Sequence, residues 1–232
     1  MKDINLTAIV PIFNEEKYLF DSVTRLQKTN IFNEIILIDN CSTDESFAIA
    51  QNLKEKDSSI SVLQTNTNSG KASAVQLGLN FVKTSHVVTH DADLEYFPSD
   101  IVEMFEISKN NPECLVLGTR FTGEKERKNV YFRTRFANRV MSLFFSVVNF
   151  SKITDVATCY KLMPTQFFQS ISLNEQGFSV EIEILSKFLK TNNKIMEIPI
   201  KYEGRSYSDG KKIKTLDGFM YLLNTLKYRF FN

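Results

Sequence analysis

Apolar strands that alternate with helices limit the fold of this chain more than any other feature. Four short apolar runs have the length of buried strands, and apolar residues recur at helical spacing between them. Such strands, without a polar face, imply a parallel sheet covered by helices on both sides. The sequence therefore predicts an α/β fold with a Rossmann-like, mostly parallel central sheet. The expected strands are 6–11, 34–39, 61–64 and 86–89, and the expected helices between them are 15–28, 43–56 and 71–83.

The second half of the chain continues the pattern less regularly. A length of 232 residues suits one large domain, which we expect at residues 1–214, followed by an amphipathic C-terminal helix at 215–232. Residues 203–214 are rich in glycine and basic side chains, which is typical of a mobile loop. The other expected elements are helices at 99–110, 127–150, 179–190 and 216–231, strands at 114–118 and 195–202, and an extended segment at 154–163.

Composition narrows the classes of partner. Lys and Arg total 28 against 27 Asp and Glu, so the charge balance gives no reason to expect nucleic acid as a partner. Three separated cysteines fit neither a disulfide framework nor a zinc site, and no leader is recognisable at the start. The longest apolar stretch, 140–150, is shorter than the ~20 residues that cross a bilayer. We expect a cytoplasmic protein.

Three acidic side chains follow the fourth strand at alternate positions, namely Asp91, Asp93 and Glu95. On an extended segment alternate side chains point the same way, so these three could converge on one hard cation such as Mg²⁺ or Mn²⁺. The alternative is a solvated acidic turn. Ligands of parallel sheets gather at the carboxyl ends of the strands, where this triplet lies. Neither a GxGxxG nor a P-loop motif is present, so phosphates would be held in another way.

The order and spacing of several motifs resemble glycosyltransferase family 2, in particular the branch typified by dolichyl-phosphate mannose synthase and its bacterial relatives. This resemblance implies a GT-A fold, a nucleotide-diphosphate sugar donor, a divalent metal and inversion at the anomeric carbon. The motifs are VPIFNEE at 10–16, IDNCSTD at 38–44, NSGK at 68–71, DADLEY at 91–96, GTRF at 118–121, TDVATCYK at 154–161 and GRSYSDGKK at 204–212.

The resemblance gives roles to residues on the donor side. Asp39 matches the acid that bonds the base or ribose, although capping of the next helix is an alternative. Asp91 and Asp93 match the DxD motif for metal and diphosphate, and Glu95 takes the place of a supporting metal contact. The residues that match the nucleoside pocket are Pro11, Phe13 and Glu15.

Basic residues match the positions that hold phosphate groups. Arg120, Arg135 and Arg205 correspond to phosphate-binding arginines, whose forked guanidinium groups suit that task. Lys211, in the expected loop, could close over the pyrophosphate, or it could belong to a solvated basic loop. Lys71 could contact a phosphate, or its glycine-lysine element could serve close packing of helix and sheet.

A general base is the least defined part of the expected site. Asp155 and Glu181 are candidates, and the motif that contains Glu181 can also be aligned so that Glu183 takes its place. Glu183 could equally belong to a helix face. A neutral hydroxyl acceptor needs a base, whereas a phosphate acceptor is already ionised at neutral pH.

The resemblance thus implies a metal-dependent inverting glycosyltransferase that uses a UDP- or GDP-sugar and a lipid-phosphate or saccharide acceptor. Two alternatives are a nucleotide-sugar-binding protein without transfer activity and a nucleotidyltransferase. The expected C-terminal helix is apolar along much of its surface and ends with Lys227 and Arg229. It could contact a membrane peripherally, form a homodimer, or pack against its own domain.

Overall fold

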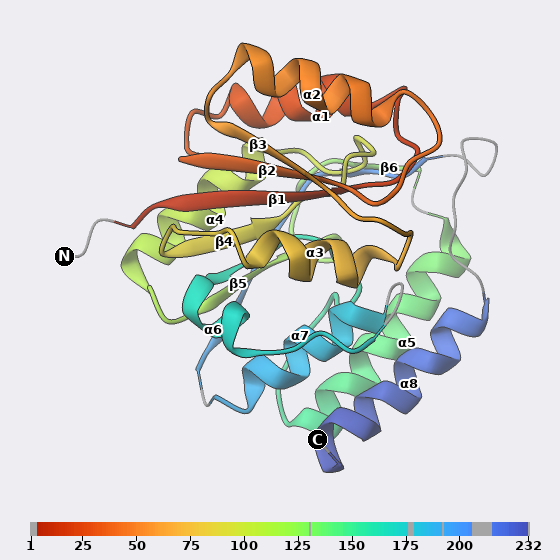
Figure 1. Cartoon of the computed structure of the whole chain (residues 1–232). Helices are drawn as coiled ribbons and strands as arrows, with labels where there is room; N and C mark the ends of the chain where they lie inside the picture. The colour runs from red at the N-terminus through yellow and green to blue at the C-terminus, as the bar shows by residue number, and fades with distance from the viewer. Residues whose placement is uncertain (1–3, 130, 176–178, 192, 206–214, 232) are drawn as a thin grey trace.

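A seven-stranded sheet with helices on both faces forms the centre of this computed structural model (Figure 1). The structure describes residues 4–129, 131–175, 179–191, 193–205 and 215–231, with side chains from Met220 onward in the last range. The strands lie in the order β3-β2-β1-β4-β7-β5-β8, and β6 pairs separately with β9. Their bounds are β1 Leu6–Ile12, β2 Glu34–Asp39, β3 Ile60–Gln64, β4 His86–Thr89, β5 Leu115–Thr119, β6 Arg127–Lys128, β7 Lys161–Pro164, β8 Ile195–Pro199 and β9 Tyr202–Glu203.

The parallel half of the sheet confirms the expected strand-helix alternation. Strand β1 pairs in parallel with β2 and β4, and β2 pairs in parallel with β3. Side chains of each strand alternate between the two faces, so Val10 and Leu37 pack on one side while Ile9 and Ile38 pack on the other. Because strands buried on both faces have no polar side, their sequences are almost continuously apolar.

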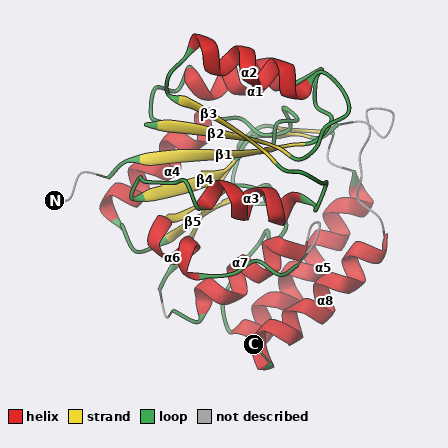
Figure 2. Cartoon of the chain, viewed as in Figure 1, coloured by secondary structure: helices red, strands yellow, loops and turns green. Residues whose placement is uncertain are grey.

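The helices divide between the two faces of the sheet (Figure 2). Helices α1, α2 and α4 contribute to one core cluster, while α3, α5, α6, α7 and α8 contribute to the other. Their bounds are α1 Leu19–Gln27, α2 Ser46–Lys56, α3 Lys71–Leu79, α4 Ser99–Asn110, α5 Phe132–Asn149, α6 Thr165–Ser170, α7 Val180–Leu189 and α8 Thr215–Phe230.

Two expectations about the second half are wrong. The helix expected from residue 127 begins only at Phe132, because Arg127 and Lys128 pair with Tyr202 and Glu203 in the small sheet. The extended segment expected at 154–163 is a strand only from Lys161 to Pro164, and this strand, β7, runs antiparallel to both of its neighbours. The residues before β7 therefore form a loop.

Helix α8 packs against α5 and α7, as the lower part of Figure 1 shows. Its side chains Tyr221 and Tyr228 are buried. The division into residues 1–214 and a C-terminal helix stays a prediction, since the helix is packed on the same body. In the described part of the chain, no helix is long and apolar enough to cross a membrane.

Candidate active site

The carboxyl ends of β1, β2 and β4 bring the expected donor-side residues to one edge of the sheet. Asp39 is the last residue of β2 and pairs in register with Ile12 of β1. Glu15 follows β1, and the acidic segment follows β4. Crossover helices place these ends side by side, so residues far apart in sequence share one edge.

Asp39 has the geometry of a buried acceptor. Its Oδ2 accepts hydrogen bonds from the Ser42 backbone N–H at 3.2 Å and from Gln64 Nε2 at 3.0 Å. Its Oδ1 is buried without a hydrogen-bond partner among the described residues. A buried acceptor without a donor is costly, and a nucleoside ring N–H or ribose hydroxyl would satisfy it. The Ser42 contact is a local turn bond rather than a helix cap, because α2 begins only at Ser46.

The acidic segment 91–95 is a turn rather than an extended strand. Strand β4 ends at Thr89, and Leu94 has a left-handed φ of 64° that reverses the chain direction. The alternation argument therefore does not apply. Asp91 pairs with Lys71, whereas Asp93 and Glu95 both contact Arg205. Asp91 Oδ1 lies 2.8 Å from Lys71 Nζ, and Asp93 Oδ2 lies 2.9 Å from Arg205 Nη2. Glu95 accepts from the Arg205 backbone N–H at 2.7 Å and from the Tyr202 hydroxyl.

These carboxylates fit a metal that arrives with a phosphate rather than one held by protein alone. No group of three or more His, Cys, Asp or Glu side chains in the described ranges is placed to hold a metal ion. Mg²⁺ commonly takes one or two carboxylates, with substrate phosphates and water completing its shell. Hard oxygen donors at Asp91 and Asp93 suit that arrangement. Burial raises the pKa of Asp93 to about 7, and repulsion from Asp91 and Glu95 adds to the effect.

Arg205 is the cation that holds this edge together. Its Nη1 and Nη2 donate to Glu15 at 3.1 and 3.2 Å, and Nη2 also donates to Asp93. Burial works against the charged guanidinium, but the carboxylates of Asp93 and Glu15 raise the pKa of Arg205. The expected phosphate ligand is thus paired with the acidic residues. Lys211, six positions further on, lies outside the described residues.

Arg120 forms a bidentate ion pair with Asp155 in the interior. Arg120 Nε lies 2.7 Å from Asp155 Oδ2, and Nη2 donates to Oδ1 at 2.8 Å. Asp155 is fully buried, and its Oδ2 also accepts from the Arg120 backbone N–H. The guanidinium lies over the rings of Tyr202, Phe121 and Tyr96 at 5.0 to 5.9 Å from their centroids. Since both carboxylate oxygens are engaged, this geometry disfavours Asp155 as a general base.

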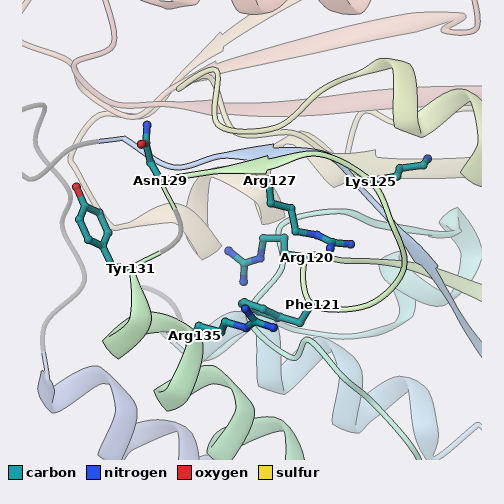
Figure 3. A pocket seen from close by; sticks show the side chains of 7 residues that line it. All are labelled: Arg120, Phe121, Lys125, Arg127, Asn129, Tyr131 and Arg135. Atoms are coloured by element: carbon teal, nitrogen blue, oxygen red, sulfur yellow. The ribbon is translucent and has the colours of Figure 1, made fainter.

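Arg120 also lines a pocket of about 560 Å³, which we call the basic pocket. Figure 3 shows its side chains, with Arg120 drawn between Arg127 and Arg135. Burial lowers the pKa of Arg127, and repulsion from Arg135 lowers it further. Closely spaced cations without an acidic side chain in the lining favour an anionic ligand. The lining residues are Arg120, Phe121, Lys125, Arg127, Asn129, Tyr131 and Arg135.

A second cavity adjoins the basic pocket. It measures about 480 Å³ and shares Phe121 and Arg135 with the basic pocket. Leu143 and Ile153 give it an apolar part, and we call it the apolar annex. Its remaining lining residues are Thr122, Arg139, Ser142, Ser146, Lys152 and Thr154.

Glu181 and Lys71 form an ion pair next to Asp91 of the acidic turn. Lys71 Nζ bridges Asp91 and Glu181, with the Glu181 Oε1 at 3.0 Å. The other Glu181 oxygen pairs with Lys161, which is completely buried. The two ion pairs disfavour Glu181 as a free base. Glu183 instead accepts backbone N–H groups of Asn174 and Glu175 and pairs with Lys187, so it anchors a loop.

The motifs did not reveal every residue of this site. Lys125, Arg127 and Tyr202 come from segments without an obvious motif. Lys125 and Arg127 line the basic pocket, and Arg127 pairs with Tyr202 where β6 meets β9. Lys161 stands in one of the family motifs. Its position at the start of an apolar strand is the signal of its role, because a buried ammonium needs a carboxylate partner. Pro11 and Phe13 lie on or after β1 and are half-buried.

A mostly parallel sheet that is covered by helices and carries polar residues at its carboxyl edge is the architecture of a GT-A glycosyltransferase. Residues 7–172 match Glycosyl transferase family 2, and the chain belongs to this family. It is 26% identical to a dolichol-phosphate mannosyltransferase of Pyrococcus furiosus, a match that covers 94% of this chain and 62% of the relative. It is also 26% identical to a UDP-N-acetylglucosamine–dolichyl-phosphate N-acetylglucosaminyltransferase of Methanococcus voltae, with 94% of both chains covered.

A solved structure supports the fold. Glucosyl-3-phosphoglycerate synthase of Mycobacterium tuberculosis, in complex with Mn²⁺, UDP and glucosyl-3-phosphoglycerate, has a TM-score of 0.73 at 14% identity. The match covers 97% of this chain and 80% of that chain.

A third sequence relative is an undecaprenyl-phosphate 4-deoxy-4-formamido-L-arabinose transferase of Sodalis glossinidius. It is 27% identical, and the match covers 97% of this chain and 68% of the relative.

Proposed function

We propose that this chain transfers a sugar from a UDP- or GDP-linked donor to the phosphate group of a lipid, with Mg²⁺ or Mn²⁺ and with inversion at the anomeric carbon. The observation that carries the proposal is the basic pocket and its continuation into the apolar annex. Of the four cations that line the pocket, Arg120 pairs with Asp155 and Lys125 pairs with Asp100 and Glu103. Arg127 and Arg135 form no ion pair with a described carboxylate and so suit a phosphate, and the adjoining apolar wall at Leu143 and Ile153 suits the start of a hydrocarbon chain. A saccharide acceptor would instead be expected to meet hydrogen-bonding amides and carboxylates.

The names of the relatives agree with this choice of acceptor. Those from Pyrococcus furiosus, Methanococcus voltae and Sodalis glossinidius are named as transferases that act on dolichyl or undecaprenyl phosphate. The chain spans only 62% of the first of them, so the activity of the whole protein is part of the proposal. The donor base stays open between uracil and guanine, because Asp39 can accept a hydrogen bond from a ring N–H of either.

The chemical step requires little acid-base catalysis by the protein. An oxygen of the lipid phosphate attacks the anomeric carbon, the bond from that carbon to the donor diphosphate breaks, and a nucleoside diphosphate leaves. The attacking phosphate is already ionised, so no general base is needed. Arg127 and Arg135 would hold and orient it, and Arg120 would be kept in place by Asp155. A metal bound with the diphosphate would neutralise the charge that develops on the leaving group.

Arg135 and Arg133 provide a matched test on one helix. Both arginines are exposed on α5, but only Arg135 lines the two pockets. With Mn²⁺, a nucleotide sugar and a short-chain, water-soluble prenyl phosphate, Arg135→Gln should raise the KM for the acceptor about tenfold through loss of a charge-assisted hydrogen bond. Arg133→Gln should leave the KM unchanged. Equal effects of both substitutions, or transfer to free sugars but to no prenyl phosphate, would overturn the assignment of the acceptor.

The two alternative classes make different products. A nucleotidyltransferase would release pyrophosphate from a nucleoside triphosphate, whereas the proposed enzyme releases a nucleoside diphosphate from a sugar donor. A binding protein would show donor affinity by calorimetry but no transfer to any acceptor. Product analysis by anion-exchange chromatography separates the three outcomes.

A lipid acceptor also requires access to a membrane, and the surface of α5 and α8 is suited to it. Six large apolar side chains are exposed along or just after α5 and five along or just after α8. The two rows adjoin where the Arg229 guanidinium lies 5.6 Å from the centroid of the Phe150 ring. The exposed residues are Phe132, Phe136, Val140, Leu143, Val147 and Phe150, and Met220, Leu223, Leu226, Phe230 and Phe231.

The charge around these two rows favours an anionic bilayer over a second copy of the chain. Residues 127–152 contain six Lys or Arg and no Asp or Glu. Residues 218–232 contain two Lys or Arg and likewise no Asp or Glu. Two such faces would repel each other, whereas acidic lipid head groups would attract them. We therefore propose peripheral membrane contact through both helices, with the protein on the cytoplasmic side. The homodimer becomes the competing outcome.

Vesicle flotation tests the membrane contact. The protein should float with vesicles that contain phosphatidylglycerol and less with purely zwitterionic vesicles. The double substitution Phe136→Ser and Leu143→Ser should reduce flotation several-fold through loss of buried apolar area. The control is Phe81→Ser, which removes a phenylalanine that is 49% exposed outside these helices. Light scattering that shows a dimer broken by the same double substitution would favour the homodimer.

A further inference from the structure

A chain of buried charges runs from the core to the acidic turn. Lys161 is completely buried in β7, and its ammonium pairs with Glu181 of α7 and donates to the Thr158 carbonyl oxygen. Glu181 reaches Lys71 at 3.0 Å, and Lys71 reaches Asp91 at 2.8 Å. The charges thus alternate in sign over four side chains. Exposure of the side chain rises along the series, from 0% at Lys161 and 4% at Glu181 to 21% at Lys71 and 28% at Asp91.

Stability alone gives no reason for this arrangement. A buried ion pair often contributes no more to stability than well-packed apolar side chains of the same volume, because desolvation offsets the attraction. The charges instead fix the direction from which the Lys71 ammonium approaches Asp91. Lys71 has a flexible stem, and with Asp91 alone its ammonium could take many positions. Glu181 attracts it from behind, so Lys71 meets Asp91 from one fixed side and engages Oδ1.

We propose that Glu181 is a positioning residue which, anchored by Lys161, holds Lys71 in place and thereby fixes the Asp91 carboxylate for the metal-diphosphate group. This inference rests on the proposed function for the identity of that group. It gives Glu181 a role other than that of a base and gives Lys161 a role in the site. A carboxylate held within a narrow range of orientations loses less conformational entropy when a ligand binds, so the affinity is higher.

Two substitutions that change the charge in opposite directions separate positioning from simple electrostatics. Glu181→Gln removes a negative charge near the site, and Lys161→Met removes a positive one at similar side-chain volume. If only the charge mattered, the first would weaken Mn²⁺ binding and the second would strengthen it. If positioning matters, both should weaken binding of Mn²⁺ with UDP, by about tenfold for the loss of one oriented contact. The readout is the Kd from calorimetry and from the Mn²⁺ paramagnetic resonance signal, not turnover.

Glu183 is the matched control for the loss of a buried carboxylate. It lies two residues further along α7, is fully buried, and pairs with Lys187 away from the acidic turn. Glu183→Gln should lower the Tm about as much as Glu181→Gln but leave the Kd for Mn²⁺ with UDP unchanged. Parallel losses of affinity in both glutamine variants would mean that general destabilisation explains the effect and would overturn the proposal.

The outcomes also separate this inference from the proposed function. Wild-type protein that binds Mn²⁺ with UDP or GDP but transfers no sugar to prenyl phosphate would overturn the function and leave the positioning role standing. Tighter Mn²⁺ binding by Lys161→Met, or wild-type affinity in Glu181→Gln, would overturn the positioning role alone. A wild-type protein that binds neither nucleotide with Mn²⁺ would overturn both.

Discussion

The Arg205 guanidinium lies 2.9 Å from Asp93, although the two residues are 112 positions apart in the chain. The same guanidinium donates to Glu15, so one arginine neutralises carboxylates from two strand ends. Its positive charge offsets the repulsion that Asp91 and Glu95 exert on Asp93. The arginine thus stabilises an acidic edge that is also proposed to bind a divalent ion.

Substitution of Arg205 by glutamine should make the stability depend on metal. Without the guanidinium the carboxylates repel each other, and in EDTA the loss should be about 1–3 kcal/mol, or a Tm lower by several degrees. A divalent ion would replace the missing charge, so Mn²⁺ should raise the Tm of Arg205→Gln more than that of the wild type. Thermal melts with EDTA and with Mn²⁺ measure both shifts. An equal response of the two proteins would contradict a shared role of arginine and metal at this edge.

Asp155→Asn should destabilise the fold rather than merely stop catalysis. The substitution leaves the buried Arg120 guanidinium without its charge partner, which typically costs about 3–5 kcal/mol. The urea midpoint should fall accordingly, with the slope unchanged. A variant with the wild-type midpoint but no turnover would instead support Asp155 as a general base.

Asp39→Asn should weaken nucleotide binding and alter its base preference. The orphaned Oδ1 of Asp39 can accept from the ring N–H of uracil or guanine, whereas an asparagine that keeps the Ser42 and Gln64 bonds presents an N–H there instead. Affinity for UDP and GDP should fall about tenfold or more, as expected for an unpaired polar contact. The ring nitrogen of cytosine accepts, so affinity for CDP should fall less. Calorimetry with the three diphosphates checks the order, and a uniform loss would exclude a base contact.

His90 should make the fold less stable as the pH falls below 6.5. It is buried between the Ser22 and Tyr160 hydroxyls, and burial lowers its pKa from 6.5 to about 4. Between pH 4 and pH 6.5 the unfolded chain binds a proton at His90 that the folded chain does not bind. The free energy of unfolding therefore decreases as the pH is lowered through this range, and the contribution of His90 is fully present above pH 6.5. The loss from this group should reach about 2 kcal/mol at pH 5.

The measurement for His90 is a comparison with His90→Gln. Urea unfolding at pH 7.5 and at pH 5 gives the difference in stability between the two proteins. This difference should shrink by about 2 kcal/mol at the lower pH, because only the wild type carries the histidine. A constant difference would mean that His90 binds its proton equally well in both states.

The parallel half of the sheet and its polar edge could be predicted from the sequence, because local periodicity fixes the strands and chain topology fixes which ends meet. The position of Asp39 at the end of β2 followed directly from this reasoning. The acidic segment was harder, since a left-handed residue such as Leu94 leaves no signal in an alternation pattern. The split of its carboxylates between Lys71 and Arg205 is a consequence of that turn.

The ion pairs could not be predicted, because their partners meet only through tertiary structure. Glu181 lies 110 positions from Lys71, and nothing near either residue indicates the other. The start of α5 at Phe132 could not be predicted for a similar reason. Arg127 and Lys128 have good helix propensity, but pairing with Tyr202 and Glu203 outweighs it.

The antiparallel strand β7 has a consequence for synthesis on the ribosome. Strand β4 gains its neighbour on that side only when Lys161–Pro164 is made, since His86 pairs with Pro164. Until then the nascent chain carries a half-sheet whose β4 edge is unpaired and apolar, the kind of edge that pairs with other chains. Growth at low temperature or with added chaperones should therefore raise the yield of folded protein, while a nascent chain truncated before residue 161 should aggregate.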